Sequence, residues 1–196
     1  MSLATEKEFS RQFFNVPNQL TTLRLILAVV LFAIIPQGYP LLATILFMIA
    51  AGTDWIDGYW ARKYGQVTTV GRIFDPFVDK IIICGTFIYL VAYPQTGVMA
   101  WMAVVVVARE MLVTALRSFL EGEGADFSAK MSGKLKMALQ CLAATLGLYS
   151  LTYSAAPPEW FATALRVSIW AAIVLTVYSG AEYLLRAWHV LRRARS

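Results

Sequence analysis

Residues 54–62 read DWIDGYWAR and residues 71–79 read GRIFDPFVD, and both stretches interrupt long apolar runs. Asp54 and Asp57 are three residues apart, and Asp75 and Asp79 are four apart, so each pair shares one helix face. Four carboxylates converging from two helices would repel one another unless cations held them. Their hard oxygen ligands suit Mg²⁺, Mn²⁺ or Ca²⁺. The spacing therefore predicts two facing helices around one or two divalent cations.

The composition predicts a membrane protein. Hydrophobic residues make up 59% of the chain and charged residues 15%, against about 45–50% and about 25% in soluble domains. A spanning helix needs about 20 mostly apolar residues. We expect an all-α integral membrane domain over residues 18–191 with about six transmembrane helices. Their approximate ranges are 21–35 (starting as early as 16), 41–60, 71–93, 98–120, 133–152 and 160–191, with a polar connection over 62–70.

The two ends of the chain are predicted to lie outside the bilayer. Residues 1–17 mix charged and aromatic side chains, which favours an amphipathic interfacial helix over a cleavable signal peptide. Residues 192–196 form a basic tail. Cys84 and Cys141 lie in apolar stretches and are expected to be buried thiols, and His189 is expected to be an interfacial side chain rather than a ligand.

The distribution of Lys and Arg predicts the orientation. If both termini are cytosolic, every Lys and Arg except Arg166 falls toward the inner side, and the outer connections near 36–40, 93–97 and 153–159 hold none. Cytoplasmic connections carry an excess of Lys and Arg. We therefore expect a multi-pass protein of the cell membrane, most simply a bacterial inner membrane, with termini and aspartates on the cytosolic side. No nucleic-acid partner is expected.

The segment 54–79 resembles the signature of the CDP-alcohol phosphotransferase family, D-x-x-D-G-x-x-A-R-x(8)-G-x-x-x-D-x-x-x-D, at every fixed position and gap. The resemblance implies that an acceptor hydroxyl attacks the β-phosphate of a CDP-linked lipid and that CMP leaves. It implies two Mg²⁺ or Mn²⁺ ions on Asp54, Asp57 and Asp75, with Asp79 as general base and further ligand. The residues implied to bind the CDP-lipid are Asp54, Asp57, Gly58, Ala61, Arg62, Gly71 and Asp75. By analogy with the family, a homodimer is expected.

Some of these positions also have a simpler structural interpretation. Gly58 and Ala61 lack bulky side chains, so a nucleotide could approach the backbone there, but small residues also allow tight helix packing in membranes. Gly71 could serve close approach or simply begin its helix. Arg62 could contact the nucleotide or extend to lipid phosphates.

A second group of basic residues bears on the acceptor. Arg109 and Arg117 are eight residues apart and share a helix face, and Lys134 and Lys136 begin the next apolar stretch. Each alone could extend to lipid headgroups, but four together beside a metal site favour a pocket for a phosphorylated acceptor. Glu110 is expected to orient Arg109 or Arg117.

Further segments within about residues 15–140 resemble the branch of the family that uses sn-glycerol 3-phosphate and CDP-diacylglycerol. They are NVPN at 15–18, ARE at 108–110, ALR at 115–117 and SGK at 132–134, while Met137 replaces the usual Thr. The product would be a phosphatidylglycerol precursor. Alternatives within the family are cardiolipin synthases, which use phosphatidylglycerol, and inositol-phosphate synthases. From other classes, a cation transporter or a purely structural membrane subunit would have to account for the same aspartates.

Overall fold

The computed structural model describes the backbone of residues 16–64, 69–122 and 131–193. Within these ranges, side chains are described except at 16–18, 20, 54–64, 69–76, 79, 121–122, 191 and 193. The predicted surface helix at 1–15 and the last tail residues, 194–196, lie outside the described residues. The described part contains helices and no strands, as the sequence predicts.

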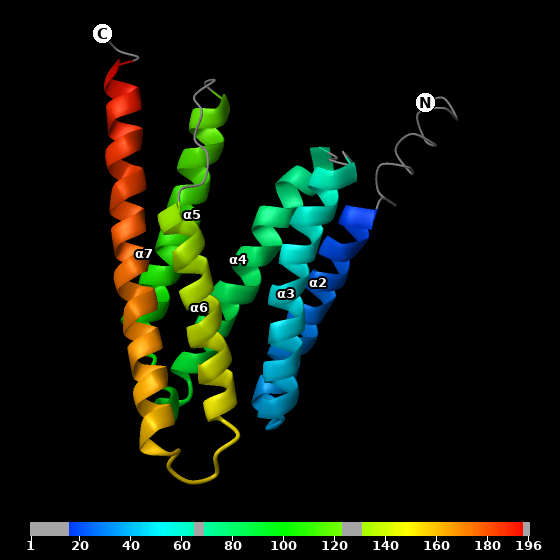
Figure 1. Cartoon of the computed structure of the whole chain (residues 1–196), viewed down its shortest axis with the longest axis vertical. Helices are drawn as coiled ribbons and strands as arrows, with labels where there is room; N and C mark the ends of the chain where they lie inside the picture. The colour runs from blue at the N-terminus through cyan, green and yellow to red at the C-terminus, as the bar shows by residue number, and fades with distance from the viewer. Residues whose placement is uncertain (1–15, 65–68, 123–130, 194–196) are drawn as a thin grey trace. The chain divides into compact units, whose positions relative to one another are not determined.

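Six α-helices follow the six apolar stretches (Figure 1). Two short 3-10 turns, η1 (Ile35–Gln37) and η2 (Pro94–Thr96), follow α2 and α4. Each turn ends on a glycine with positive φ, 80° at Gly38 and 72° at Gly97, a conformation that glycine adopts without strain. The helices are α2 (Val16–Ile34), α3 (Pro40–Tyr64), α4 (Thr69–Val91), α5 (Ala100–Gly122), α6 (Met131–Ser150) and α7 (Glu159–Arg193).

The polar connection predicted over 62–70 is wrong at both ends. Helix α3 continues to Tyr64 and α4 begins at Thr69, so at most residues 65–68 connect them. Arg62, Lys63 and Tyr64 are polar or aromatic but are compatible with a helix. Polarity alone therefore did not mark the end of the helix.

The chain divides into two compact units, residues 1–86 and 87–196. In the first unit, α2 packs along α3 through small and large apolar side chains that include Ala28, Leu31, Ala43 and Phe47, all fully buried. Gly85 of α4 lies directly against the ring of Phe32, where no Cβ would fit. This glycine lets α2 and α4 approach closely.

In the second unit, α7 packs against both α5 and α6. Because α5, α6 and α7 alternate in direction, the end of α5, the start of α6 and the end of α7 lie at one end of this unit (Figure 1). A buried hydrogen bond from Gln140 Nε2 to Thr176 Oγ1, 2.9 Å long, joins α6 to α7. Polar groups thus lie inside the unit.

The outer surface is strongly apolar. On α7, Val167, Val174 and Leu185 are each more than 60% exposed, whereas Thr176 and Ser179 are fully buried. Large contiguous apolar surfaces mark membrane or protein contacts. Among the described residues, one stretch, Glu159–Val190 of α7, is both long and apolar enough to cross a membrane, and shorter apolar helices lie at Thr21–Gln37, Pro40–Thr53 and Lys80–Val91.

Candidate active site

The four motif aspartates are carried by two consecutive helices of the first unit. Asp54 and Asp57 lie on α3, and Asp75 and Asp79 lie on α4. Their side chains are outside the described residues, so the predicted convergence of the carboxylates stays a prediction. The same holds for Gly58, Ala61, Arg62 and Gly71 as residues that bind the CDP-lipid.

Helix geometry nevertheless gives the distance of each aspartate from the connection between the two helices. Only four residues separate Tyr64 from Thr69, so α3 ends and α4 begins within about 18 Å of each other. At a rise of about 1.5 Å per residue, Asp57 and Asp75 lie about 10 Å and about 9 Å along their helices from this connection. Asp54 and Asp79 each lie about 15 Å from it. The two pairs therefore lie at similar distances along their helices from the connection, which is compatible with a shared cation site.

The predicted acceptor residues lie in the second unit, and three of them, Arg109, Arg117 and Lys136, form a largely buried cluster in which Glu110 contacts Arg109 and Lys136. Glu110 is 7% exposed and Lys136 4% exposed. The carboxylate of Glu110 accepts a hydrogen bond from Lys136 Nζ and a longer one, 3.4 Å, from Arg109 Nη1. Glu110 therefore orients Arg109, as expected, and also holds Lys136 of the neighbouring helix.

Arg117 is held by a different partner, which the sequence analysis did not identify. Its Nη2 donates a hydrogen bond of 3.0 Å to the hydroxyl of Tyr183 on α7. The guanidinium carbons of Arg109 and Arg117 lie 5.7 Å and 5.8 Å from the centroid of the Tyr183 ring. Both distances are within the range of a cation–π contact. One buried tyrosine thus contacts both arginines of α5.

Helix α7 also makes room for this arrangement. A Cβ at Gly180 would lie 3.1 Å from Cγ of Arg109, so the stem of Arg109 runs across the helix where a side chain is missing. Two residues farther along α7, Glu182 accepts a 2.7 Å hydrogen bond from Ser132 of α6. The three helices of the unit therefore all contribute to the cluster.

The cluster carries more positive than negative charge. Among the described residues, Arg109, Arg117 and Lys136 supply three cationic groups, and Glu110 and Glu182 supply two carboxylates, which leaves an excess of one positive charge. The buried Nε atoms of Arg109 and Arg117 have no hydrogen-bond partner among the described residues. A buried cationic group without a counter-charge is costly. The arrangement is suited to an anion with several oxygen acceptors, such as a phosphate.

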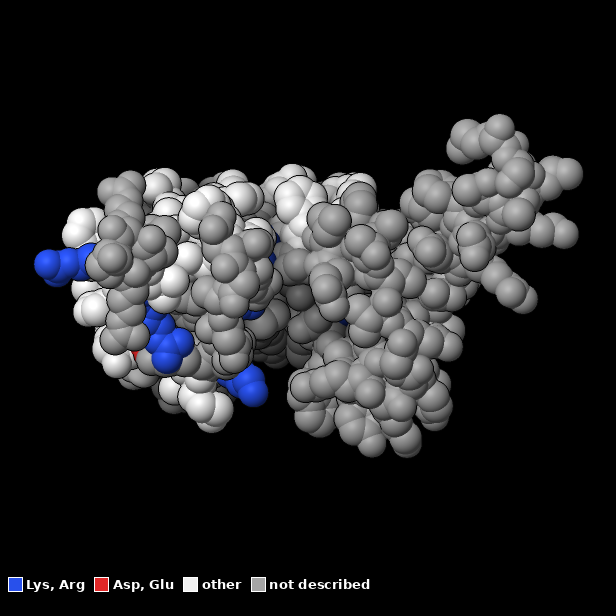
Figure 2. Space-filling model, turned by 90° about the horizontal axis from the view of Figure 1, so that it is seen from above, with Lys and Arg blue, Asp and Glu red and all other residues white. Residues whose placement is uncertain are grey.

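Lys134 lies differently from the other three predicted residues. It is exposed, and the described part of the chain offers it no ion pair. Among the described residues drawn in Figure 2, Lys and Arg side chains are prominent at the surface of the end of the second unit that carries Lys134. Lys134 belongs to this basic surface rather than to the buried cluster.

The sequence contained a signal for Tyr183 and Gly180. Small or polar residues recur along α7 at Ala172, Thr176, Gly180, Tyr183 and Ala187, within an otherwise apolar helix, and all five are buried. Such a stripe indicates the helix face that packs against the protein. It identifies the face, although not the partners.

The comparison with protein families agrees with the motif. The model of CDP-alcohol phosphatidyltransferases matches residues 14–178. The chain belongs to the CDP-alcohol phosphatidyltransferase family. It is therefore a transferase of the class that the motif at 54–79 predicts. The matched range includes the four aspartates and all four predicted acceptor residues, and it ends before Gly180 and Tyr183.

Within this family, the chain is similar over most of its length to proteins named CDP-diacylglycerol–glycerol-3-phosphate 3-phosphatidyltransferase. The relative from Bacillus subtilis is 36% identical, with 91% of this chain and 98% of the relative covered. The relative from Haemophilus influenzae is 32% identical, with 87% and 92% covered. That from Escherichia coli is 31% identical, with 87% and 93% covered.

Proposed function

We propose that this family member is a phosphatidylglycerophosphate synthase. It transfers the phosphatidyl group of CDP-diacylglycerol to sn-glycerol 3-phosphate and releases CMP. The observation that carries the acceptor assignment is the largely buried, net cationic cluster in which Glu110 contacts Arg109 and Lys136 and Tyr183 contacts Arg109 and Arg117. An acceptor that carries its own phosphate would supply the missing negative charge. The names of the similar proteins support the same acceptor.

In the proposed reaction, the acceptor hydroxyl oxygen bonds to the β-phosphorus of CDP-diacylglycerol. The bond from that phosphorus to the bridging oxygen breaks, and CMP leaves with the bridging oxygen. Asp79 takes the proton of the hydroxyl as general base. The cationic cluster binds the acceptor phosphate and so orients the hydroxyl, which contributes through positioning.

The family is known to use divalent metal ions, and the donor set of this chain fits them. Four carboxylates at similar distances from the connection between α3 and α4 provide the hard oxygen ligands that Mg²⁺ or Mn²⁺ prefers. Asp54, Asp57 and Asp75, with Asp79, would hold two ions. When bound, such ions neutralise the charge of a pyrophosphate and stabilise attacking and leaving oxygens. Gly58, Ala61, Arg62 and Gly71 are proposed to contact the CDP moiety.

We also propose a multi-pass arrangement in the cell membrane, with both termini and the active site cytosolic, and a homodimer as the assembly. The apolar outer surface of α7 and the distribution of Lys and Arg support the membrane placement. Single cysteines at Arg192 and at Gln95, in a background without Cys84 and Cys141, test the orientation. A membrane-impermeant thiol reagent added to intact cells should label position 95 and leave position 192 unlabelled; the reverse pattern would contradict the proposal.

An acceptor screen tests the proposed reaction. Purified protein receives CDP-diacylglycerol and Mg²⁺ with sn-glycerol 3-phosphate, phosphatidylglycerol or inositol 1-phosphate, and mass spectrometry identifies the lipid product while CMP release is measured. We expect product with sn-glycerol 3-phosphate alone. Faster turnover with phosphatidylglycerol would reassign the chain to cardiolipin synthesis, and faster turnover with inositol phosphate would reassign it to the inositol branch.

A further inference from the structure

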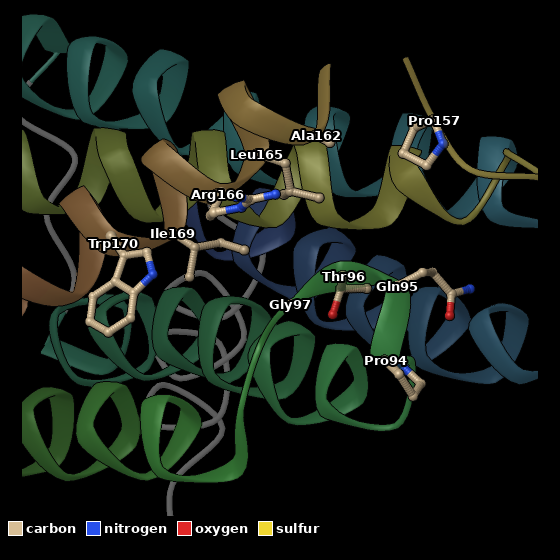
Figure 3. Close-up of a pocket in the computed structure, with 10 residues that line it drawn as sticks. All are labelled: Pro94, Gln95, Thr96, Gly97, Pro157, Ala162, Leu165, Arg166, Ile169 and Trp170. Atoms are coloured by element: carbon tan, nitrogen blue, oxygen red, sulfur yellow. The ribbon is translucent and has the colours of Figure 1, made fainter. Parts of the chain in front are cut away.

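A cavity of about 160 Å³ lies at the end of the second unit opposite the cationic cluster (Figure 3). One wall is the η2 turn from Pro94 to Gly97, and the other is a stripe of α7 near its start. Figure 3 shows the lining side chains of α7 facing this turn. The α7 residues are Ala162, Leu165, Arg166, Ile169 and Trp170. The cavity is thus mostly apolar with one cationic side chain.

The η2 wall is held in place by its own hydrogen bonds. Thr96 is 1% exposed, and its hydroxyl lies 2.9 Å and 2.8 Å from the carbonyl oxygens of Leu90 and Tyr93. The same hydroxyl accepts a hydrogen bond from the backbone N–H of Val98 at 3.2 Å. The turn also packs against α6. A ligand would therefore meet a preformed wall, which lowers the cost of binding.

Arg166 is the charged group of the cavity. It is the only Lys or Arg between Lys136 and Arg186 in the sequence. Its side chain is exposed, and no carboxylate among the described residues pairs with it. Glu159, the nearest acid along α7, is seven residues away. The guanidinium is therefore available to an external anion and presents a fork of donors that matches phosphate oxygens.

Aromatic residues indicate the depth of the cavity in a membrane. Trp170 packs on Trp101 of α5, with ring centroids 5.9 Å apart. At the same end of the unit, Tyr149 and Tyr153 pack on Phe161. Trp and Tyr concentrate where lipid headgroups meet the hydrocarbon. In the proposed membrane placement, Arg166 lies six residues, about 9 Å along α7, from Trp160. Side chains of a helix lean toward its start, so the guanidinium of Arg166 can extend to the level of the lipid phosphates.

We propose that this cavity binds the phosphate of an anionic membrane phospholipid through Arg166, with the glycerol backbone of the lipid against Leu165 and Ile169. The proposal rests on the membrane placement given above. Seventeen residues separate Arg166 from Tyr183, about 25 Å along α7, so this site is separate from the acceptor cluster. The bound lipid would contact the η2 turn and α7 together and stabilise the end of the unit away from the chemistry.

Native mass spectrometry of the purified full chain tests the site. Delipidated protein is titrated with phosphatidylglycerol or with zwitterionic phosphatidylcholine, and retained lipid is counted. Arg166→Gln removes the charge, Ala162→Phe fills the cavity while keeping the charge, and Arg192→Gln is the matched control at the other end of α7. We expect one tightly retained phosphatidylglycerol in wild type and in the control, with affinity about tenfold lower in the other two variants.

Several results would overturn the proposal. Equal retention in Arg166→Gln and wild type would exclude the arginine, and full retention in Ala162→Phe would place the lipid on the surface rather than in the cavity. Displacement by excess inorganic phosphate would identify a free-anion site instead. Should Ala162→Phe fail to fold, Ala162→Leu replaces it. Lipid retention is measured without either substrate, so it tests the cavity even where the proposed reaction fails. Phosphatidyl transfer should be unchanged in Arg166→Gln.

Discussion

Arg117 Nη2 donates a hydrogen bond to the hydroxyl of Tyr183 at 3.0 Å, although the two residues are 66 positions apart. The ring of Tyr183, 2% exposed, also lies beneath the guanidinium of Arg109. Tyr183 therefore sets the position of both arginines from a helix that carries no basic residue of the cluster. The binding of a phosphate between the two arginines would depend on the positions in which Tyr183 holds them.

Replacing Tyr183 should weaken acceptor binding more than donor binding. Tyr183→Phe keeps the ring but removes the hydrogen-bond acceptor of Arg117, a change of about 1–2 kcal/mol. We expect the KM for sn-glycerol 3-phosphate to rise about tenfold and the KM for CDP-diacylglycerol to stay within about twofold. Tyr183→Leu, which also removes both cation–π contacts, should raise the acceptor KM further. Steady-state CMP release measures both constants, and equal changes for the two substrates would contradict this role.

Arg117 and Lys134 should contribute unequally. Arg117 is part of the buried cluster, whereas Lys134 is on the exposed basic surface. Arg117→Ala should raise the acceptor KM more than about tenfold, and Lys134→Ala should raise it about threefold or less, because exposed charges interact weakly. The effect of Lys134→Ala should also fade at high salt, since screening acts on exposed groups. A larger effect for Lys134 would show that the acceptor binds at the surface.

The ion pair of Lys136 with Glu110 should stabilise the second unit. Lys136→Met leaves a buried carboxylate with only its longer contact to Arg109, and breaking one side of a buried pair costs about 3–5 kcal/mol. We expect the apparent Tm in detergent to fall by about 6–20 °C. The double variant Lys136→Met/Glu110→Gln should recover part of this loss, because the carboxylate left without Lys136 is removed, while Arg109 loses its charged partner. It should remain inactive. A double variant as unstable as the single one would show that packing, rather than charge, holds the two helices.

The motif aspartates should be required for chemistry and not for folding. Asp79→Asn removes the proposed general base, and Asp75→Asn removes a proposed metal ligand. CMP release should fall by about a hundredfold or more in each, while insertion into membranes and the elution profile in detergent stay normal. Asp126→Asn, in the connection between α5 and α6, is the matched control and should be fully active. Turnover at the wild-type rate in either motif variant would refute the assignment.

Removing divalent cations should likewise stop the chemistry without unfolding the protein. After chelation, CMP release should stop and should return when Mg²⁺ or Mn²⁺ is added, because the four carboxylates need cations to bind a pyrophosphate. The apparent Tm should change with added metal in wild type and much less in Asp75→Asn. Full activity in excess chelator would exclude the proposed metal site.

Helix positions were largely predictable from the sequence because their signals are local. Apolar runs set the six helices, and Pro36, Gly38, Pro94 and Gly97 mark breaks that the structure confirms. The end of α3 was wrong because Arg62 to Tyr64 are polar yet helical. The polar segment is therefore longer than the true connection. Whether each helix spans a membrane stays a prediction, since among the described residues only α7 contains a stretch that is both long and apolar enough to cross one.

The site was predictable only where its residues are close in sequence. The contact of Glu110 with Arg109, its neighbour in the sequence, is confirmed. The convergence of the four aspartates stays a prediction, because their side chains lie outside the described residues. Tyr183 was missed because its partners are on another helix, and no local pattern identifies which residues meet across α5 and α7. The different surroundings of Lys134 and Lys136 were not predicted for the same reason. Two residues apart on α6, they point about 200° apart around the helix, so one faces Glu110 and the other faces outward.

Helix α7 has 35 residues, which makes it about 52 Å long, whereas a bilayer's hydrocarbon core is about 30 Å thick. In the proposed membrane placement, with its outer end near the level of Trp160, more than three turns of α7 would extend beyond the opposite face of the hydrocarbon. These overhanging turns begin close to Tyr183. A water-soluble substrate such as glycerol phosphate could therefore reach the cluster without entering lipid, while a diacyl donor stays embedded, so one enzyme can join reactants from two phases.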